Sequence, residues 1–342
     1  MKDHKNIVVT GGTGYIGSHT VVELLTQGYN VHILDNLSNS KVSMVDRIQE
    51  ITGICPKFTE LDLRNSDDVN SFFNSNQKIS GIIHFAALKS VGDSVNNPLE
   101  YYNNNMIGLV NLLQAVSKFS ISNFVFSSSC TVYGSPENLP VTEDSKIGYT
   151  PSPYGATKQM CERILNDFTF SKSLFKAISL RYFNPLGAHE SKLIGELPSG
   201  IPNNLLPYIT QTAAGLRNSL SVFGSDYNTP DGTAIRDYIH VCDLASAHVK
   251  ALDYLSNRSE SVHEKLNVGT GVGLSVLEVI HSFEETSGLK LNYKIVDRRE
   301  GDIECIYADT SKAEKLLNWK AKYSIDDMTR SAWEWEQKLR GV

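Results

Sequence analysis

The chain has 342 residues, of which 41% are hydrophobic and 20% charged, the composition of an ordinary globular protein. At about 150 residues per domain, this length predicts two domains or one large unit. The formal charge of −6 does not favour a nucleic-acid or anionic-membrane partner, because such partners require a concentrated basic face. No segment approaches the run of about 18 apolar residues that a membrane-spanning helix needs.

The cysteines indicate a reducing compartment. The five of them are odd in number, widely scattered and never spaced as CxxC: Cys55, Cys130, Cys161, Cys242 and Cys305. This pattern predicts reduced thiols and a cytoplasmic protein. The first ten residues lack the apolar core of a secretory signal, so we expect none. Because HExxH, GxxxxGK[ST] and GxSxG are absent, we expect no metal, no P-loop and no simple hydrolase elbow.

Short apolar runs alternate with helical patterns through the first half of the chain. The runs lie at 7–9, 31–34, 58–61, 81–85 and 123–126. Helical patterns cover 15–27, the region around Val45 and Ile48, and a long stretch at about 98–119. Brief apolar runs between helices are typical of parallel strands buried on both faces. The alternation predicts a doubly wound α/β fold of the Rossmann type.

The pattern changes after Asn184, where glycines and prolines cluster and longer loops begin. We therefore predict a Rossmann domain over residues 1–184 and a smaller C-terminal α/β substrate domain over 185–342. Segments such as 237–255 are expected to return and pack on the first domain.

A glycine-rich turn follows the first predicted strand. Residues 12–17 fit GxGxxG, Gly11 extends the motif, and a helical pattern begins within it. Glycines allow backbone N–H groups at a helix N-terminus to approach a pyrophosphate. The next strand ends in Asp35, whose carboxylate can bind ribose hydroxyls and would repel a 2′-phosphate. This combination predicts NAD rather than NADP, although a tight turn without a ligand would look similar.

Tyr154 and Lys158 form a YxxxK pair after Pro153, which favours a helix start. Spacing of four places both side chains on one helix face. The same spacing is also common for two unrelated residues on an exposed helix face, which is the alternative interpretation. A phenol with a pKa near ~10 must lose about 3 units, or about 4 kcal/mol, to act as a base near neutrality. A cation ~4 Å away at an effective dielectric of ~20 supplies about that much. Lys158 and an oxidised nicotinamide are the two candidate cations.

Ser129 lies just after the strand predicted at 123–126. Ligands of open α/β sheets bind at the carboxyl ends of strands. A serine there can hydrogen-bond a reacting oxygen and exchange protons with Tyr154, or it can simply cap a turn or helix.

Motifs spread over nearly the whole chain carry a family resemblance. They are VTGGTGYIGSHT (9–20), LDNLSNS (34–40), HFAALKSVGDSV (84–95), FSSSCTVYG (126–134), YGATK (154–158), RYFNPLGAH (181–189), GIPNNLLPYI (200–209), DGTAIRDYIHVCDLA (231–245) and RREGD (298–302). Together they resemble the extended short-chain dehydrogenase/reductase family and, within it, the UDP-glucose (UDP-galactose) 4-epimerase family.

The resemblance implies an isomerase that interconverts UDP-glucose and UDP-galactose through transient oxidation at C4. Tyr154 would take the proton of the 4-hydroxyl while the C4 hydride passes to tightly bound NAD. The 4-keto sugar would rotate, and hydride would return to its opposite face. Ser129 would hold O4, and Lys158 would bind the nicotinamide ribose and lower the pKa of Tyr154. A homodimer is also implied, with the long helices after Pro98 and Pro153 as candidate interfaces.

The resemblance also implies the ligand contacts of individual residues. Besides Ser129, Tyr154 and Lys158, the cofactor set is Gly11, Gly14, Tyr15, Ile16, Gly17, Asp35, Asn36, Ser40, Asp62, Leu63, Ala86, Ala87, Lys89, Asn104 and Phe183. Besides Ser129 and Tyr154, the nucleotide-sugar set is Asn184, Asn204, Leu205, Phe223, Arg236, Tyr238, Arg299, Asp302 and Ile306. A guanidinium suits a diphosphate, but the two arginines would also suit surface ion pairs, and the asparagines would suit loops or caps.

Two rival functions stay open in the sequence. Nucleotide-sugar 4,6-dehydratases need further acid and base groups, and in the related motif an Asp and a Glu stand where this chain has Cys130 and Thr131. We therefore expect the chemistry to stop at C4. A non-catalytic NAD-binding sensor would not need Ser129, Tyr154 and Lys158.

Substrate width depends on Ile306, which aligns with the position that gates the sugar C2 pocket in this family. Its side chain is intermediate in size and stiff because it is β-branched. We expect UDP-glucose and UDP-galactose to be preferred, with activity on UDP-N-acetylglucosamine, in addition or instead, as the alternative.

Overall fold

The computed structural model describes residues 5–299 and 301–341, so Glu300 of the 298–302 motif lies outside the described residues. The first part of the chain forms β1 (Asn6–Thr10), α1 (Tyr15–Thr26), β2 (Asn30–Asp35), α2 (Ser43–Thr52), β3 (Lys57–Glu60), α3 (Ser66–Ser75), β4 (Ile79–His84), α4 (Val91–Asn96), α5 (Pro98–Tyr102), α6 (Gly108–Lys118), β5 (Asn123–Ser129), α7 (Pro153–Ser171) and β6 (Lys176–Tyr182). The rest forms β7 (Asn184–Leu186), α8 (Leu205–Ala213), β8 (Leu220–Phe223), β9 (Ile235–His240), α9 (Val241–Ser256), β10 (Val262–Val268), β11 (Gly273–Ser275), α10 (Val276–Ser287), β12 (Tyr293–Val296), β13 (Cys305–Ile306), α11 (Ser311–Leu317) and α12 (Ile325–Arg340).

The main sheet has seven parallel strands in the order β10-β6-β5-β4-β1-β2-β3. Its strand order reverses beside β1, so the expected doubly wound Rossmann fold is confirmed. The five strands predicted from apolar runs are β1 to β5. The sequence analysis did not predict β6 and β10, because each contains polar residues that are buried here, Arg181 in β6 and Asn267 in β10.

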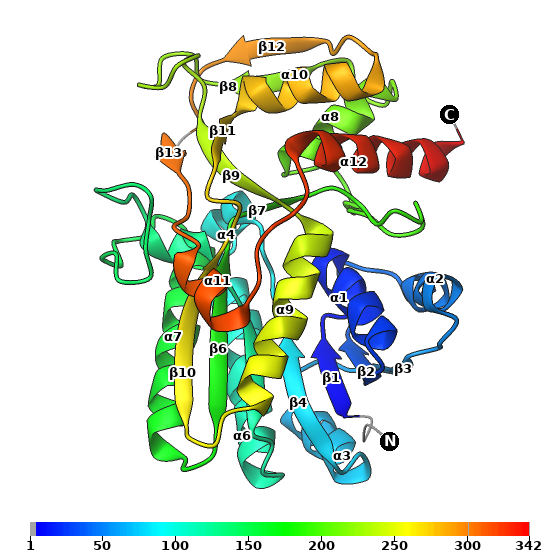
Figure 1. Ribbon diagram of the computed structural model, residues 1–342, viewed down its shortest axis with the longest axis vertical. Coiled ribbons are helices and arrows are strands. Elements are labelled where there is room, and N and C mark those ends of the chain that lie inside the picture. The colour runs from blue at the N-terminus through cyan, green and yellow to red at the C-terminus, as the bar shows by residue number, and fades with distance from the viewer. Residues whose placement is uncertain (1–4, 300, 342) are drawn as a thin grey trace.

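Helices cover both faces of this sheet (Figure 1). One apolar core joins its strands to α1, α2, α9 and α11, and a second joins them to α3, α6 and α7. The chain beyond residue 184 therefore contributes to this layer as well, since α9 lies along α1 and β10 forms the sheet edge. The long helix expected at 98–119 is interrupted, because a π-helical turn at Asn103–Ile107 separates α5 from α6.

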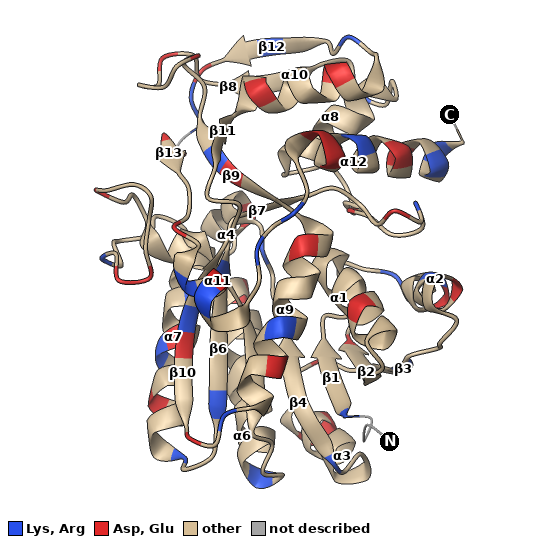
Figure 2. Ribbon diagram, viewed as in Figure 1, with Lys and Arg blue, Asp and Glu red and all other residues tan. Residues whose placement is uncertain are grey.

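A smaller α/β unit lies beyond the carboxyl ends of the main strands (Figure 1). It contains β9 with β7, β11 and β13, the pair β8–β12, and helices α8, α10 and α12 around a third apolar core. Acidic and basic residues are interspersed along its helix α12 and along α7 below it (Figure 2). In the described part of the chain, no helix combines the length and apolar character needed to cross a membrane.

Candidate active site

The glycine turn joins β1 to α1 in a form that only glycine permits. Gly11 has φ +70°, and a Cβ there would lie 2.7 Å from the backbone nitrogen of Ala86. A Cβ on Gly17 would lie 2.2 Å from the carbonyl oxygen of Gly11. The helix begins after Gly14, which provides no side-chain cap, and its first turn contains no acidic residue. Such an uncapped N-terminus is suited to an anionic group.

Asp35 ends β2 directly beside this turn. Its carboxylate accepts hydrogen bonds from the backbone nitrogen of Thr13 at 3.1 Å and of Leu37 at 3.0 Å, and from Ser40 Oγ at 3.3 Å. Asn36 donates to Asp62 at 3.4 Å, and the Arg64 side chain lowers the pKa of Asp62 to about 2. The predicted adenosine side of the site is therefore one connected loop cluster, with Leu63 buried next to Asp62.

Further predicted cofactor residues follow the carboxyl ends of neighbouring strands. Ala86, Ala87 and Lys89 follow β4, and buried Phe183 follows β6. Asn104 lies in the π-helical turn and donates to Asn105, whose side chain holds the backbone of Leu88. These positions lie along the edge that also carries Gly11 and Asp35, as expected for ligands of a doubly wound sheet.

The three predicted catalytic residues lie where α7 begins and β5 ends. Tyr154 and Lys158 are both buried, at 8% and 3% exposure, and Pro153 is the first residue of α7. Lys158 Nζ donates to the carbonyl oxygen of Ser127 at 2.6 Å and lies 5.7 Å from the centre of the Tyr154 ring. Ser129 is the last residue of β5, and its side chain lies close enough to Tyr154 to lower the pKa of the phenol. The solvent-exposed alternative for this pair is therefore wrong.

Burial dominates the electrostatics of this group. Desolvation raises the pKa of Tyr154 well above its usual value, against a smaller lowering by the side chain of Ser129. Desolvation also lowers the pKa of Lys158 to about 8. Burial is the largest effect on the pKa of Tyr154, so the lowering expected from Lys158 stays a prediction. The second candidate cation of the sequence analysis, the nicotinamide, remains a hypothesis.

The predicted nucleotide-sugar residues gather around β9. Asp302 Oδ1 accepts from Arg236 Nη2 at 2.6 Å and lies 3.3 Å from Arg299 Nη2. Both arginines therefore do form ion pairs, but Arg236 is largely buried. In the strand register, Asn184 of β7 lies opposite Tyr238 of β9, and Ile306 of β13 lies opposite Arg236 of β9.

The remaining members of that set lie on the same unit. Phe223 ends β8, with the Arg299 guanidinium 5.8 Å from its ring centre. Asn204 occupies the N-cap position of α8, whose first residue is Leu205, but its side chain makes no capping hydrogen bond. The Asn204 amide donates to Glu196 at 2.6 Å, so it is joined to the cofactor side rather than to the Arg236 group.

Comparison with known proteins places the chain in a family. Residues 8–332 match a family described as GDP-mannose 4,6 dehydratase. A Drosophila melanogaster protein named UDP-glucose 4-epimerase is 52% identical, covering 97% of this chain and 96% of its own length. A UDP-glucose 4-epimerase from Stenotrophomonas maltophila, solved with NAD and formylated UDP-arabinopyranose, superposes with a TM-score of 0.95 at 47% identity over 99% of this chain and 100% of its own.

This chain belongs to the UDP-glucose 4-epimerase family of extended short-chain dehydrogenases/reductases. A second solved member, from Bifidobacterium longum in complex with NAD⁺ and UDP, has a TM-score of 0.94 and 46% identity over 98% of this chain and 99% of its own.

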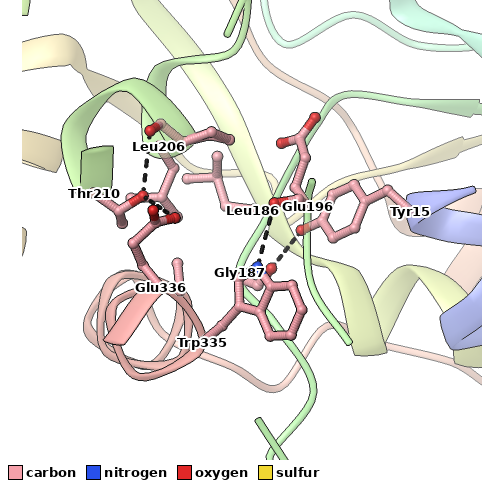
Figure 3. Close-up of a pocket in the computed structure, with 10 residues that line it drawn as sticks. Tyr15, Leu186, Gly187, Glu196, Leu206, Thr210, Trp335 and Glu336 are labelled. Atoms are coloured by element: carbon pink, nitrogen blue, oxygen red, sulfur yellow. Dashed lines mark hydrogen bonds between the residues drawn. The ribbon is translucent and has the colours of Figure 1, made fainter. Parts of the chain in front are cut away.

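Tyr15 begins α1 beside the glycine turn, where it was predicted to help surround the pyrophosphate. Its side chain leaves the glycine turn and enters a small pocket between α1, β7, α8 and α12, where Trp335 and Glu196 also lie (Figure 3). Its hydroxyl donates to the carbonyl oxygen of Gly187 at 2.6 Å. Only the backbone of Tyr15 is therefore left to face a pyrophosphate at the start of α1.

Sequence reasoning missed three charged residues of this site. Glu196 accepts from both Lys89, at 3.1 Å, and Asn204, and so connects the two predicted ligand sets. Glu162 and Arg181 form a buried ion pair behind Tyr154 and Lys158. Glu162 could have been found, because it continues the four-residue spacing of Tyr154 and Lys158. In the described residues no group of three metal-ligating side chains was found.

Proposed function

We propose that this protein is an isomerase that interconverts UDP-glucose and UDP-galactose, with NAD as its cofactor. The observation that carries the proposal is the buried group of Ser129, Tyr154 and Lys158 at the carboxyl edge of a doubly wound sheet. Its residue types suit removal of a proton from an alcohol. The family membership supplies the substrate class.

The residues present fit NAD. The uncapped start of α1 suits the pyrophosphate, and Asp35 suits the adenosine ribose. Within the described residues, Lys158 makes one hydrogen bond, although an ammonium has three donors. Its remaining donors suit ribose hydroxyls. When bound, NAD supplies the acceptor and later the donor of the C4 hydride. We assign this cofactor to residues 1–184 and the nucleotide sugar chiefly to 185–342.

The chain's own residues manage the proton and the orientation of the sugar. Tyr154 takes the proton of the 4-hydroxyl, and Ser129 holds O4 next to the phenol oxygen. Because burial raises the pKa of Tyr154, the phenolate forms only where positive charge is nearby, and Lys158 is the resident source of it. When the 4-keto sugar presents its other face, Tyr154 returns the proton. The net change is inversion at C4 without net oxidation.

Arg236 and Arg299 are proposed to hold the diphosphate. Two guanidinium groups that share one carboxylate keep N–H donors that can bind a second anion. Asp302 orients both of them. Tyr238, Asn184, Phe223, Asn204 and Leu205 complete the nucleotide-sugar site in this proposal.

The chemistry is proposed to stop at C4 and to prefer sugars without an N-acetyl group. Cys130 and Thr131 follow Ser129 and provide no carboxylate for a dehydration. Ile306 is buried at 2% exposure in a cluster with Val132 and Tyr133. A stiff, packed side chain at that position leaves little room for a C2 substituent.

We further propose a cytoplasmic homodimer. All five cysteines are free, which suits a reducing compartment. Helices α6 and α7 form an apolar groove, lined by Val110, Leu113, Gln114, Ser117, Lys118, Ile164, Phe168, Ser171 and Lys172. A second copy would cover it. Light scattering that gives the mass of one chain at micromolar concentration would contradict the dimer.

The deciding experiment is a coupled assay with UDP-galactose and no added NAD. We expect UDP-glucose to form at once, because the cofactor is regenerated in place and copurifies. Nuclear magnetic resonance of the product checks the reaction, since a 4-keto-6-deoxy sugar would indicate a dehydratase instead. A protein that contains NAD but does not interconvert the two sugars, and whose Tyr154→Phe variant is equally inactive, would indicate the alternative function of a non-catalytic NAD-binding sensor.

A further inference from the structure

A charged network lies inside the molecule directly behind the three catalytic residues. Arg181 on β6 and Glu162 on α7 are 1% and 3% exposed. Their contact is bidentate, with Arg181 Nε 2.9 Å from Glu162 Oε1 and Nη2 2.6 Å from Oε2. A pair of this geometry fixes direction as well as distance.

The carboxylate of this pair contacts the strand that carries Ser129. Ser128 Oγ donates to Glu162 Oε1 at 2.6 Å. On α7, Glu162 follows Lys158 by four residues and Tyr154 by eight, so the three share one helix face. Glu162 therefore joins the catalytic face of α7 to the residue immediately before Ser129.

The guanidinium of the pair contacts the turn that follows Ser129. Arg181 Nη1 donates to the Tyr133 hydroxyl at 3.1 Å, and the guanidinium carbon Cζ lies 5.0 Å from the centre of the Tyr133 ring. The Tyr133 hydroxyl in turn donates to Asn267 on β10 at 2.6 Å. Along the chain, Ser129 thus lies between Ser128, which is bound by Glu162, and Tyr133, which is bound by Arg181.

Stability alone does not account for a buried ion pair in this position. Desolvation cancels much of the attraction between buried charges, and apolar side chains of similar volume often serve a core equally well. What an ion pair with hydrogen-bonded neighbours adds is a defined arrangement of the elements that it joins. Here those elements are the ones that bear Tyr154, Lys158 and Ser129.

We propose that the Glu162–Arg181 pair is a positioning device that sets the distance between Ser129 on β5 and Tyr154 and Lys158 on α7. The inference rests on the proposed epimerase function. Neither member touches substrate in this proposal. Their effect is on the alignment of the proton-transfer groups, and it should therefore appear in kcat.

Two single variants test the device: Ser128→Ala removes one contact and leaves the charges paired, whereas Glu162→Gln removes the negative charge of the pair. Ser128→Ala should lower kcat for UDP-galactose about threefold to tenfold, and Glu162→Gln about tenfold to 100-fold, because small misplacements of reacting groups have such costs. KM should stay within about twofold in both variants, and NAD content should stay within about twofold in Ser128→Ala, which keeps the ion pair. The control is Asp167→Asn, which breaks the exposed Arg163–Asp167 ion pair on the same helix and should change nothing.

A double variant separates alignment from folding. Glu162→Gln leaves an unpaired buried guanidinium, which can destabilise the fold. Glu162→Met with Arg181→Met removes both charges at similar volume, so its thermal midpoint and NAD content should recover. Its kcat should stay about tenfold or more below that of the unmodified protein.

Three results would overturn the inference. The first is unchanged kcat in Ser128→Ala, and the second is recovery of full kcat together with stability in the double variant. The third is a parallel fall of kcat, NAD content and thermal midpoint in every variant, which would indicate a purely structural role. If the unmodified protein does not convert UDP-galactose, the proposed function fails instead.

Discussion

Lys158 donates its 2.6 Å hydrogen bond to the carbonyl oxygen of Ser127, two residues before Ser129, rather than to a carboxylate. The nearby carboxylate of Glu162 is bound by Arg181. The ammonium is therefore held in the core by a neutral acceptor, and its charge stays available to the phenol and to a ligand. Burial of this charge lowers the pKa of Lys158 to about 8.

Lys158→Met should remove activity and change the pH dependence of stability. Between pH 8 and 10.5 the unfolded chain keeps the lysine proton that the folded chain has lost, so the stability of the unmodified protein rises with pH across this window. At pH 7 the variant avoids burying a charged lysine, so its free energy of unfolding should exceed that of the unmodified protein. This difference should shrink by about 3 kcal/mol on going to pH 10.5. Urea unfolding of nucleotide-free protein measures it. The exposed Lys41→Met is the control, and a constant difference between Lys158→Met and the unmodified protein would contradict the prediction.

Tyr154→Phe should lower kcat by about 10² to 10⁴, the usual contribution of a general base, with NAD retained. Phenylalanine keeps the buried ring and removes only the hydroxyl, so the thermal midpoint should barely move. Tyr149→Phe, at an exposed tyrosine five residues earlier in the chain, should behave as the unmodified protein in the UDP-galactose assay. Equal rates in the two variants would exclude Tyr154 as the base.

Gly17→Ala should abolish NAD retention. The new Cβ would lie 2.2 Å from the carbonyl oxygen of Gly11, so the turn or the start of α1 must move. Gly92→Ala in α4 is the matched control, because its Cβ meets nothing within 4 Å, and alanine is the better helix former. NAD released on denaturation, measured by absorbance, should fall only in Gly17→Ala. Retained NAD in that variant would show that the turn tolerates a side chain.

The sequence predicted those parts of the fold in which local pattern and burial agree. Strands β1, β2, β4 and β5 have buried apolar runs, and all were expected. The short strand β3 was also expected, although its sequence KFTE is mostly polar and partly exposed. In β6 and β10, the buried Arg181 and Asn267 find their partners far along the chain: Glu162 pairs with Arg181, and the Tyr133 hydroxyl bonds both residues. Such long-range pairing leaves no local pattern. The break at 103–107 has the same origin, since Asn105 there bonds Leu88 and Thr157.

In the site, too, residues with a local sequence signal were predicted and residues placed by long-range contacts were not. Tyr154, Lys158 and Ser129 were found from spacing and strand ends, which are local signals. Glu196 joins Lys89, 107 residues away, to Asn204, and only the folded chain brings these together. The outward turn of the Tyr15 side chain toward Gly187 likewise depends on a partner 172 residues away.

Ile306→Ala should widen the range of substrates. Ile306 is packed against Val132, Tyr133 and Phe183, and removing its three carbons leaves space next to the position assigned to the sugar C2 group. A pocket difference of this size changes discrimination by about 10-fold to 200-fold. The ratio of kcat/KM for UDP-N-acetylglucosamine to that for UDP-galactose should rise by that order.

The same substitution should cost about 2 to 5 kcal/mol of stability, because it leaves a cavity in a packed cluster. Ile295→Ala, at a half-exposed isoleucine in β12, is the control and should change neither the substrate ratio nor the thermal midpoint appreciably. If Ile306→Ala loses stability while the ratio stays constant, Ile306 packs the core without gating the sugar. Selectivity would then be set by other residues around β9.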